Sequence, residues 1–152
     1  MCLMSDLHKE KLILENFLPY RLSFLTGIIS QKLASLYSRQ YNLTPQEWKV
    51  MANLRHHADI SAAGVGEKTA LDKVAVSRAV RGLCDKELVD RTISDQDRRR
   101  SVLNLSERGR EIYHHIEPLV IDYENHLLDI LDDREKDALG QIMDKLTAHV
   151  KS

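Results

Sequence analysis

The sequence predicts a mainly α fold with one small β-hairpin, organised as a winged helix-turn-helix between long N- and C-terminal helices. Three observations support this prediction. Amphipathic segments with apolar residues three and four apart open and close the chain. Between them, a short helical segment, a tight turn and a second helical segment follow one another. Two β-prone runs joined by an arginine-rich turn come directly after.

The N-terminal helix is predicted from about Tyr20 to Tyr41, with Pro19 in its first turn. One side of it is apolar at helical spacing, through Leu22, Leu25, Ile28, Ile29, Leu33, Leu36 and Tyr37. The next helix has a clearer start, because Thr44, Pro45 and Glu47 form a capping box in "NLTPQEWKVMANLRHH". Its predicted buried side consists of Trp48, Met51, Ala52 and Leu54.

A helix-turn-helix is predicted in the middle of the chain. A short helix from Ala62 to Thr69 leads through a tight turn at residues 70–71 into a second helix from Lys73 to about Lys86, which Asp72 caps. The core side of the second helix consists of Val76, Val80 and Leu83. Its other face, which is small and basic, carries Val74, Ser77, Arg78 and Arg81.

The runs Val89 to Ser94 and Ser101 to Leu105 predict a hairpin whose turn carries three consecutive arginines, Arg98 to Arg100. Beside a helix in the major groove, such a wing reaches the phosphate backbone or the minor groove, where arginine is favoured. Asp95 and Asp97 are expected to brace the turn by holding one arginine in place. The alternative is a solvated charged turn that binds nothing.

The C-terminal part is predicted to form two further helices. Ser106 starts a long one, and Asp132 with Glu135 forms a capping-box-like pair before the last. The last helix has one apolar side, made of Leu139, Ile142, Met143, Leu146 and Val150. The apolar stripes at both chain ends exceed what one small winged domain can cover, which favours burial across a dimer interface. Packing within the monomer alone is the alternative.

Charge separates along the chain although the net charge is −1. Residues 72–110 carry ten Lys or Arg and seven Asp or Glu, whereas residues 111–152 carry four and ten. The middle of the chain, and not its acidic end, is therefore the part suited to a polyanion. The sequence shows no membrane-length apolar run and no secretory signal, so a soluble, cytoplasmic protein without a membrane partner is expected.

Three segments together resemble the MarR family of bacterial winged-helix transcription regulators: "LTPQEWKVMANL", "LDKVAVSRAVRGLCDKELVDR" and "DRRRSVLNLSERG". Asp97 and Arg99 match the family's Asp-x-Arg wing motif, and Leu105, Ser106 and Gly109 match its Leu-Thr-x-x-Gly continuation. The resemblance covers about residues 20–150. It implies a homodimer with interlocked terminal helices, two lobes on a pseudo-palindromic site in double-stranded DNA, and often a small ligand that releases the DNA.

Two features depart from the family pattern. Glu87 stands where the family commonly has glycine after the recognition helix, so the exit turn needs a left-handed non-glycine residue or a rearrangement. Gly64 and Gly66 weaken the short supporting helix, so the sequence does not determine at which residues this helix begins and ends.

The residues expected at DNA lie on the recognition helix and on the wing. They are Lys73 for a phosphate, Ser77, Arg78 and Arg81 for base edges or backbone, Val74 or Ala75 for a thymine methyl group, and Arg98, Arg99 and Arg100 in the wing. By analogy with the family, Asp97 braces Arg99.

The predicted organisation is one intertwined domain, with a helical dimerisation region at residues 1–41 and 106–152 and a DNA-binding region at residues 42–105. The predicted function is a sequence-specific, dimeric transcriptional repressor. Release by a small aromatic or anionic effector is a further hypothesis, and a regulator that needs no ligand is the alternative. Arg55, His56 and His57 are candidates to meet such an effector, and a solvated helix end is the alternative. A non-specific architectural DNA-binding protein is the rival function.

No enzyme, metal or cofactor site is predicted, because the chain has no Gly-rich phosphate loop and no nucleophile motif. The adjacent pairs His56–His57 and His114–His115 point in different directions on a helix. A metal-responsive regulator that uses His114, His115 and His126 across a dimer stays open, against solvent-facing or core histidines. Cys2 and Cys84 match no metal-ligand spacing, and redox sensing is the alternative to a buried structural thiol.

Overall fold

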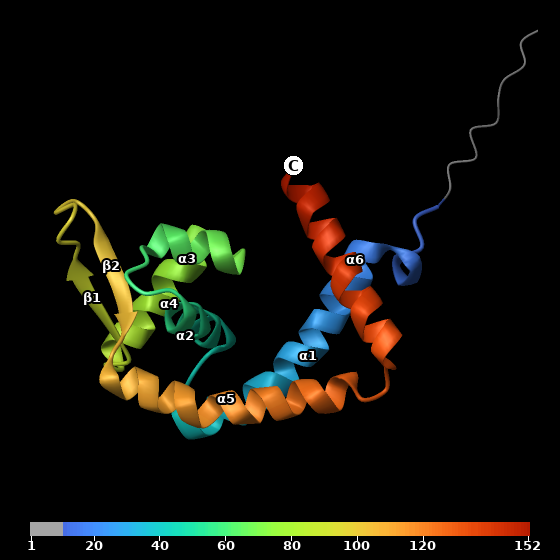
Figure 1. Ribbon diagram of the computed structural model, residues 1–152, viewed down its shortest axis with the longest axis horizontal. Coiled ribbons are helices and arrows are strands. Elements are labelled where there is room, and N and C mark those ends of the chain that lie inside the picture. Colours follow the sequence, from blue (N-terminus) through green and yellow to red (C-terminus); the bar gives the residue numbers. More distant parts are fainter. Residues whose placement is uncertain (1–10) are drawn as a thin grey trace, which may run out of the picture. The chain divides into compact units, whose positions relative to one another are not determined.

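The computed structural model describes residues 11–152. They form one 3₁₀ turn, six α-helices and one antiparallel hairpin (Figure 1). In chain order the elements are η1 (Leu14–Asn16), α1 (Leu18–Tyr41), α2 (Pro45–His56), α3 (Ala62–Thr69), α4 (Lys73–Asp85), β1 (Val89–Ile93), β2 (Ser101–Leu105), α5 (Glu107–Leu128) and α6 (Asp133–Lys151). The predicted fold class, a mainly helical winged helix-turn-helix, is confirmed.

The described residues divide into two compact units, one that ends at Lys32 and one that comprises residues 33–152, and the division falls inside α1. The described part of the first unit consists of η1 and the first turns of α1, and its large apolar side chains are mostly exposed. The second unit contains the hydrophobic core and all of the predicted DNA-binding elements.

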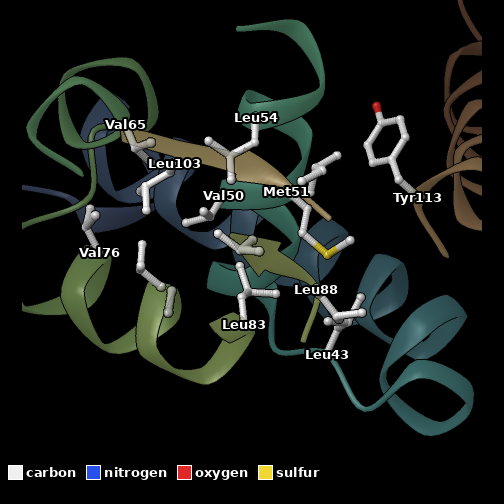
Figure 2. Packing of buried hydrophobic residues seen from close by; sticks show 14 of the residues in the cluster. Leu43, Val50, Met51, Leu54, Val65, Val76, Leu83, Leu88, Leu103 and Tyr113 are labelled. Atoms are coloured by element: carbon white, nitrogen blue, oxygen red, sulfur yellow. The ribbon is translucent and has the colours of Figure 1, made fainter. Parts of the chain in front are cut away.

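The core of the second unit fills the space between α2, α3, α4 and the hairpin (Figure 2). Val50 and Met51 from α2, Leu83 from α4 and Leu103 from β2 are fully buried in it, and Val65 provides the contribution of α3. On α4 the three predicted core positions are buried, as are Met51 and Leu54 on α2. Trp48 and Ala52 are only half-buried at the edge of the core.

Local capping determines where these helices begin. The capping box of α2 is present, because Thr44 Oγ1 accepts from the Glu47 backbone N–H at 3.1 Å and Glu47 Oε2 accepts from that of Thr44 at 3.0 Å. Asp72 caps α4, Ser106 caps α5, and Asp132 with Glu135 forms a second capping box at α6. All four helix starts are where the sequence predicts them.

The two departures from the family pattern are accommodated in the backbone. Glu87 adopts the left-handed conformation with φ 60°, and it forms the exit turn together with Leu88, whose N–H donates to the Leu83 carbonyl at 2.9 Å. The short helix α3 keeps its predicted bounds because the Ser61 side chain caps it and Ala70, also left-handed, ends it.

The base of the wing is tied to the loop after α2. β1 and β2 pair from Val89↔Leu105 to Ile93↔Ser101, and Ile60 adds an isolated bridge to Leu103. Next to this bridge, Asp59 and Asn104 bond reciprocally: the Asp59 backbone N–H donates to Asn104 Oδ1 at 2.9 Å, and Asn104 Nδ2 donates to Asp59 Oδ1 at 2.8 Å. The hairpin is therefore fixed to the loop after α2 along the edge of β2 that does not pair with β1.

Three aromatic rings form a stack between helices of the second unit. Trp48 of α2 lies between Tyr37 near the end of α1 and Tyr113 of α5, with ring centroids 5.5 and 5.1 Å apart. Burial raises the pKa of the Tyr37 hydroxyl, and burial together with Glu117 raises the pKa of Tyr113, so both rings are held as neutral phenols.

The apolar side of α6 is exposed along its whole length, through Leu139, Ile142, Met143, Leu146 and Val150. In α1, Tyr37 is buried, whereas Leu22, Leu25 and Ile28 are exposed. No helix within residues 11–152 has the length and apolar character needed to cross a membrane.

Candidate nucleic-acid interface

The exposed face of α4 carries every side chain that the sequence assigns to it. Val76, Ala79, Val80 and Leu83 point into the core, so Lys73, Val74, Ser77, Arg78 and Arg81 are left on the surface. Val74 is 64% exposed although it is apolar. An exposed aliphatic side chain among basic ones is suited to apolar contact with the methyl group of a thymine in the major groove.

The wing turn is held together by its own backbone. The Ser94 N–H donates to the Arg100 carbonyl at 2.8 Å, and the Arg100 N–H donates to the Asp97 carbonyl at 2.9 Å. Asp97 Oδ1 accepts from the backbone N–H of Arg99 at 3.0 Å. The Asp97 carboxylate thus bonds to the main chain of Arg99 and makes no ion pair with its guanidinium within the described residues. The three arginine side chains are exposed.

The positively charged side chains on the exposed face of α4 and on the wing turn form no ion pairs with other described residues. Within residues 11–152, ion pairs join Lys86 to Glu47, Arg108 to Glu87 and His126 to Asp122. None of them involves Lys73, Arg78, Arg81, Arg98, Arg99 or Arg100. Unpaired, exposed guanidinium and ammonium groups on a helix and an adjacent wing are suited to the phosphates and base edges of a duplex.

The exit of the recognition helix is fastened to the start of α5. The Leu88 carbonyl accepts from the Ser106 N–H at 3.0 Å, and Ser106 Oγ donates to the Glu87 carbonyl at 2.7 Å. Gly109 packs so closely against the Leu88 carbonyl that a Cβ atom would overlap it. This contact explains why the wing motif continues to a glycine, and it fixes where the wing begins.

The effector candidates at the end of α2 are only partly brought together. Arg55 lines a hollow of about 160 Å³ with Leu54, Ala58, Asn104, Leu105 and Arg110, whereas His56 and His57 do not line it. Arg110 Nη1 donates to the Leu105 carbonyl at 2.8 Å, which holds the second guanidinium at the hollow. Helical spacing could not identify Arg110 as a partner of Arg55, because the two residues lie 55 positions apart in the chain.

The remaining candidates are scattered. The rings of His114 and His115 have centroids 6.4 Å apart. Among the described residues, no group of three or more His, Cys, Asp or Glu side chains could hold a metal ion. Cys84 is a half-buried free thiol on α4. Cys2 lies outside the described residues.

A helix-turn-helix followed by a basic antiparallel wing defines the class of winged helix-turn-helix DNA-binding proteins. Residues 41–100 match the sequence model of the MarR family. The HTH-type transcriptional regulator SarZ of Staphylococcus epidermidis is 28% identical over 100 residues, which make up 64% of this chain and 68% of SarZ. The family model and the curated relative thus both make the chain similar to the MarR family of transcriptional regulators.

Solved structures show the same fold. A MarR/EmrR family transcriptional regulator from Acinetobacter sp. ADP1 superposes with a TM-score of 0.85 at 26% identity, over 92% of this chain and 99% of that one. The fold also matches BpsR of Bordetella bronchiseptica, whose DNA binding is regulated by 6-hydroxynicotinic acid. That superposition has a TM-score of 0.80 at 18% identity, over 90% of this chain and 97% of BpsR.

Proposed function

We propose that this regulator binds a pseudo-palindromic operator as a homodimer and represses transcription from it. The observation that carries the proposal is that the exposed basic side chains of α4 and of the wing form no ion pair among the described residues. Two such lobes, spaced by one helical turn of DNA of about 34–36 Å, would read two half-sites of a palindrome. Because its target is the chromosome, the protein would act in the cytoplasm.

Each exposed residue takes the role that its chemistry favours. Lys73, in the first turn of α4, meets a phosphate, since its ammonium is a point charge on a flexible stem. Arg78, Arg81 and Ser77 lie further along the same face and reach base edges or backbone, while Val74 or Ala75 covers a thymine methyl group. In the wing, Arg98, Arg99 and Arg100 follow the backbone or enter the minor groove, and Asp97 braces the turn.

The dimer would be formed by residues 1–41 and 106–152, around a DNA-binding region at residues 42–105. Support comes from the exposed apolar side chains in α1 and α6, which would cost free energy if they stayed in water. A C2 interface built from them would bury each stripe against its counterpart.

An effector would act through the relative position of the two lobes. Arg55 and Arg110 at one hollow of the lobe favour a small anion, and 6-hydroxynicotinic acid, the regulator of DNA binding by BpsR, is a suitable probe. It would release DNA only by binding more tightly to a DNA-incompetent spacing of the lobes. Loss of DNA binding on its addition to the wild type, but not to Arg110→Ala, is the expected result, and equal release from both would place its site elsewhere.

The function is tested by fluorescence anisotropy with the DNA upstream of the protein's own gene and with a scrambled duplex, over a salt series. A preference of about a thousandfold or more for the upstream DNA is expected of a specific regulator. Equal, salt-sensitive binding to both duplexes would favour the rival function, an architectural DNA-binding protein. Absence of binding to either would refute the proposal.

A further inference from the structure

A buried ion pair joins the recognition helix to α2. Glu47 is 5% exposed and is the one buried charged residue in the part of the chain that the structure describes. Its Oε2 atom lies 2.7 Å from Lys86 Nζ and also accepts the capping bond from Thr44. Lys86 Nζ donates in addition to the Asn42 carbonyl. The carboxylate therefore has a full partner for its charge in spite of its burial.

The ends of the two helices favour this pairing. Glu47 is in the first turn of α2, where the helix dipole stabilises an anion, and Lys86 is the C-cap of α4, where the dipole stabilises a cation. Gly82, one turn before Lys86, leaves room for the carboxylate, because a Cβ atom there would overlap Glu47 Oε1. The sequence predicts the cap but gives no sign that its glutamate is also the partner of a lysine 39 residues away.

Arg78 lines the same hollow as Glu47. A hollow of about 270 Å³ between α2 and α4 is lined by Thr44, Gln46, Glu47, Ala75, Arg78 and Ala79. Glu47 is nevertheless paired with Lys86, and Arg78 is in none of the ion pairs among residues 11–152. Without Lys86, the Glu47 carboxylate would be a buried charge without a partner. Such a charge strongly favours an ion pair with a nearby guanidinium, here that of Arg78.

We propose that Lys86 is a positioning residue for DNA recognition: by neutralising Glu47, it leaves the Arg78 guanidinium free to contact DNA. Lys86 itself need not touch the duplex. The inference rests on the proposed function, since it assumes that α4 enters the major groove.

The test measures, by fluorescence anisotropy, the affinity of each variant for a DNA duplex that the wild-type protein binds specifically. Lys86→Met should weaken specific binding by about 5- to 150-fold, which is the loss expected for one arginine contact. Lys86→Gln, which keeps a hydrogen-bond donor near the carboxylate, should lose affinity in the same range and provides the test if Lys86→Met does not fold. The double variant Glu47→Gln/Lys86→Met should recover wild-type affinity within about twofold, because no unpaired carboxylate remains. Lys145→Met, on α6 but off its apolar side, removes the same charge away from this site and serves as the control.

A double-mutant cycle with Arg78→Ala separates this role from a structural one. Arg78→Ala should weaken binding in the wild type and have little further effect in the lysine variant. Full additivity, or no recovery in the double variant, would overturn the inference and leave the pair as a stabilising contact. Failure of the wild type to bind any DNA would instead overturn the proposed function.

Discussion

The carboxylate of Asp97 lies 3.0 Å from the backbone nitrogen of Arg99, and through that bond it fixes the main chain of the wing turn. Asp97→Ala is expected to weaken DNA binding by about 2- to 12-fold, the cost of ordering one mobile side chain at an interface. This direction is opposite to simple electrostatics, because removal of a negative charge near phosphates otherwise strengthens binding. Anisotropy with the operator gives the measurement.

Asp95 provides the matched control for this prediction. It is exposed in the same turn, and its side chain makes none of the hydrogen bonds or ion pairs found within residues 11–152. Asp95→Ala should therefore leave affinity unchanged or raise it. If both variants bind more tightly than the wild type, Asp97 acts only as a charge and does not brace the wing.

Gly109→Ala is expected to lower the free energy of unfolding by about 1–3 kcal/mol or more, because the new methyl group overlaps the Leu88 carbonyl, which is backbone and cannot move away cheaply. Gly66→Ala in α3 should have the opposite sign, with a gain of about 0.5–1 kcal/mol. Its Cβ would make ordinary contacts at 3.6 and 3.7 Å and would raise helix propensity. Urea unfolding of both variants makes the comparison, and a neutral Gly109→Ala would contradict the proposed clash.

Glu87→Gly should stabilise the protein by about 1 kcal/mol, since it removes the strain of a left-handed non-glycine residue at φ 60°. The pair lost with Arg108 is long, at 3.9 Å, and exposed, so its contribution is small. Glu111→Gly, in the interior of α5, is the control and should cost about 1 kcal/mol. Destabilisation by both substitutions would show that the exit turn does not store strain.

Ile142→Glu is expected to convert the proposed dimer to a monomer without unfolding the lobe, because it places a charge in the centre of the apolar side of α6. Gln141→Glu adds the same charge on the opposite side of the helix and should leave the dimer intact. Sedimentation equilibrium measures the masses, and circular dichroism checks the fold. A wild type that stays monomeric at all concentrations would refute the dimer.

Local signals were enough to predict most of the fold. The caps at Thr44, Asp72 and Ser106 depend on residues three apart, and α3 is held in place by its own cap despite its glycines. The start of α1 at Leu18, two residues before the predicted one, carries no comparable cap signal. Boundaries without a side-chain cap are the ones that spacing alone cannot place.

The contacts that the sequence did not predict join residues far apart in the chain. Asp59 bonds to Asn104, 45 residues away, and Glu47 pairs with Lys86 across 39 residues. No periodicity within one element reports such partners. In the wing, a brace by Asp97 was predicted, but spacing alone could not distinguish a bond to the Arg99 main chain from one to the Arg99 guanidinium. The structure has the bond to the main-chain N–H, which is two residues from Asp97 and within easy reach of its short side chain.

The stack of Tyr37, Trp48 and Tyr113 has an optical consequence. Trp48 is the only tryptophan in the sequence, so selective excitation of its indole reports on one place, where α1, α2 and α5 meet. Two stacked phenol rings set the surroundings of that indole, and their displacement would change its emission. The unlabelled protein thus contains its own fluorophore for following, in real time, whether DNA or an effector changes the packing between the lobe and the helices that flank it.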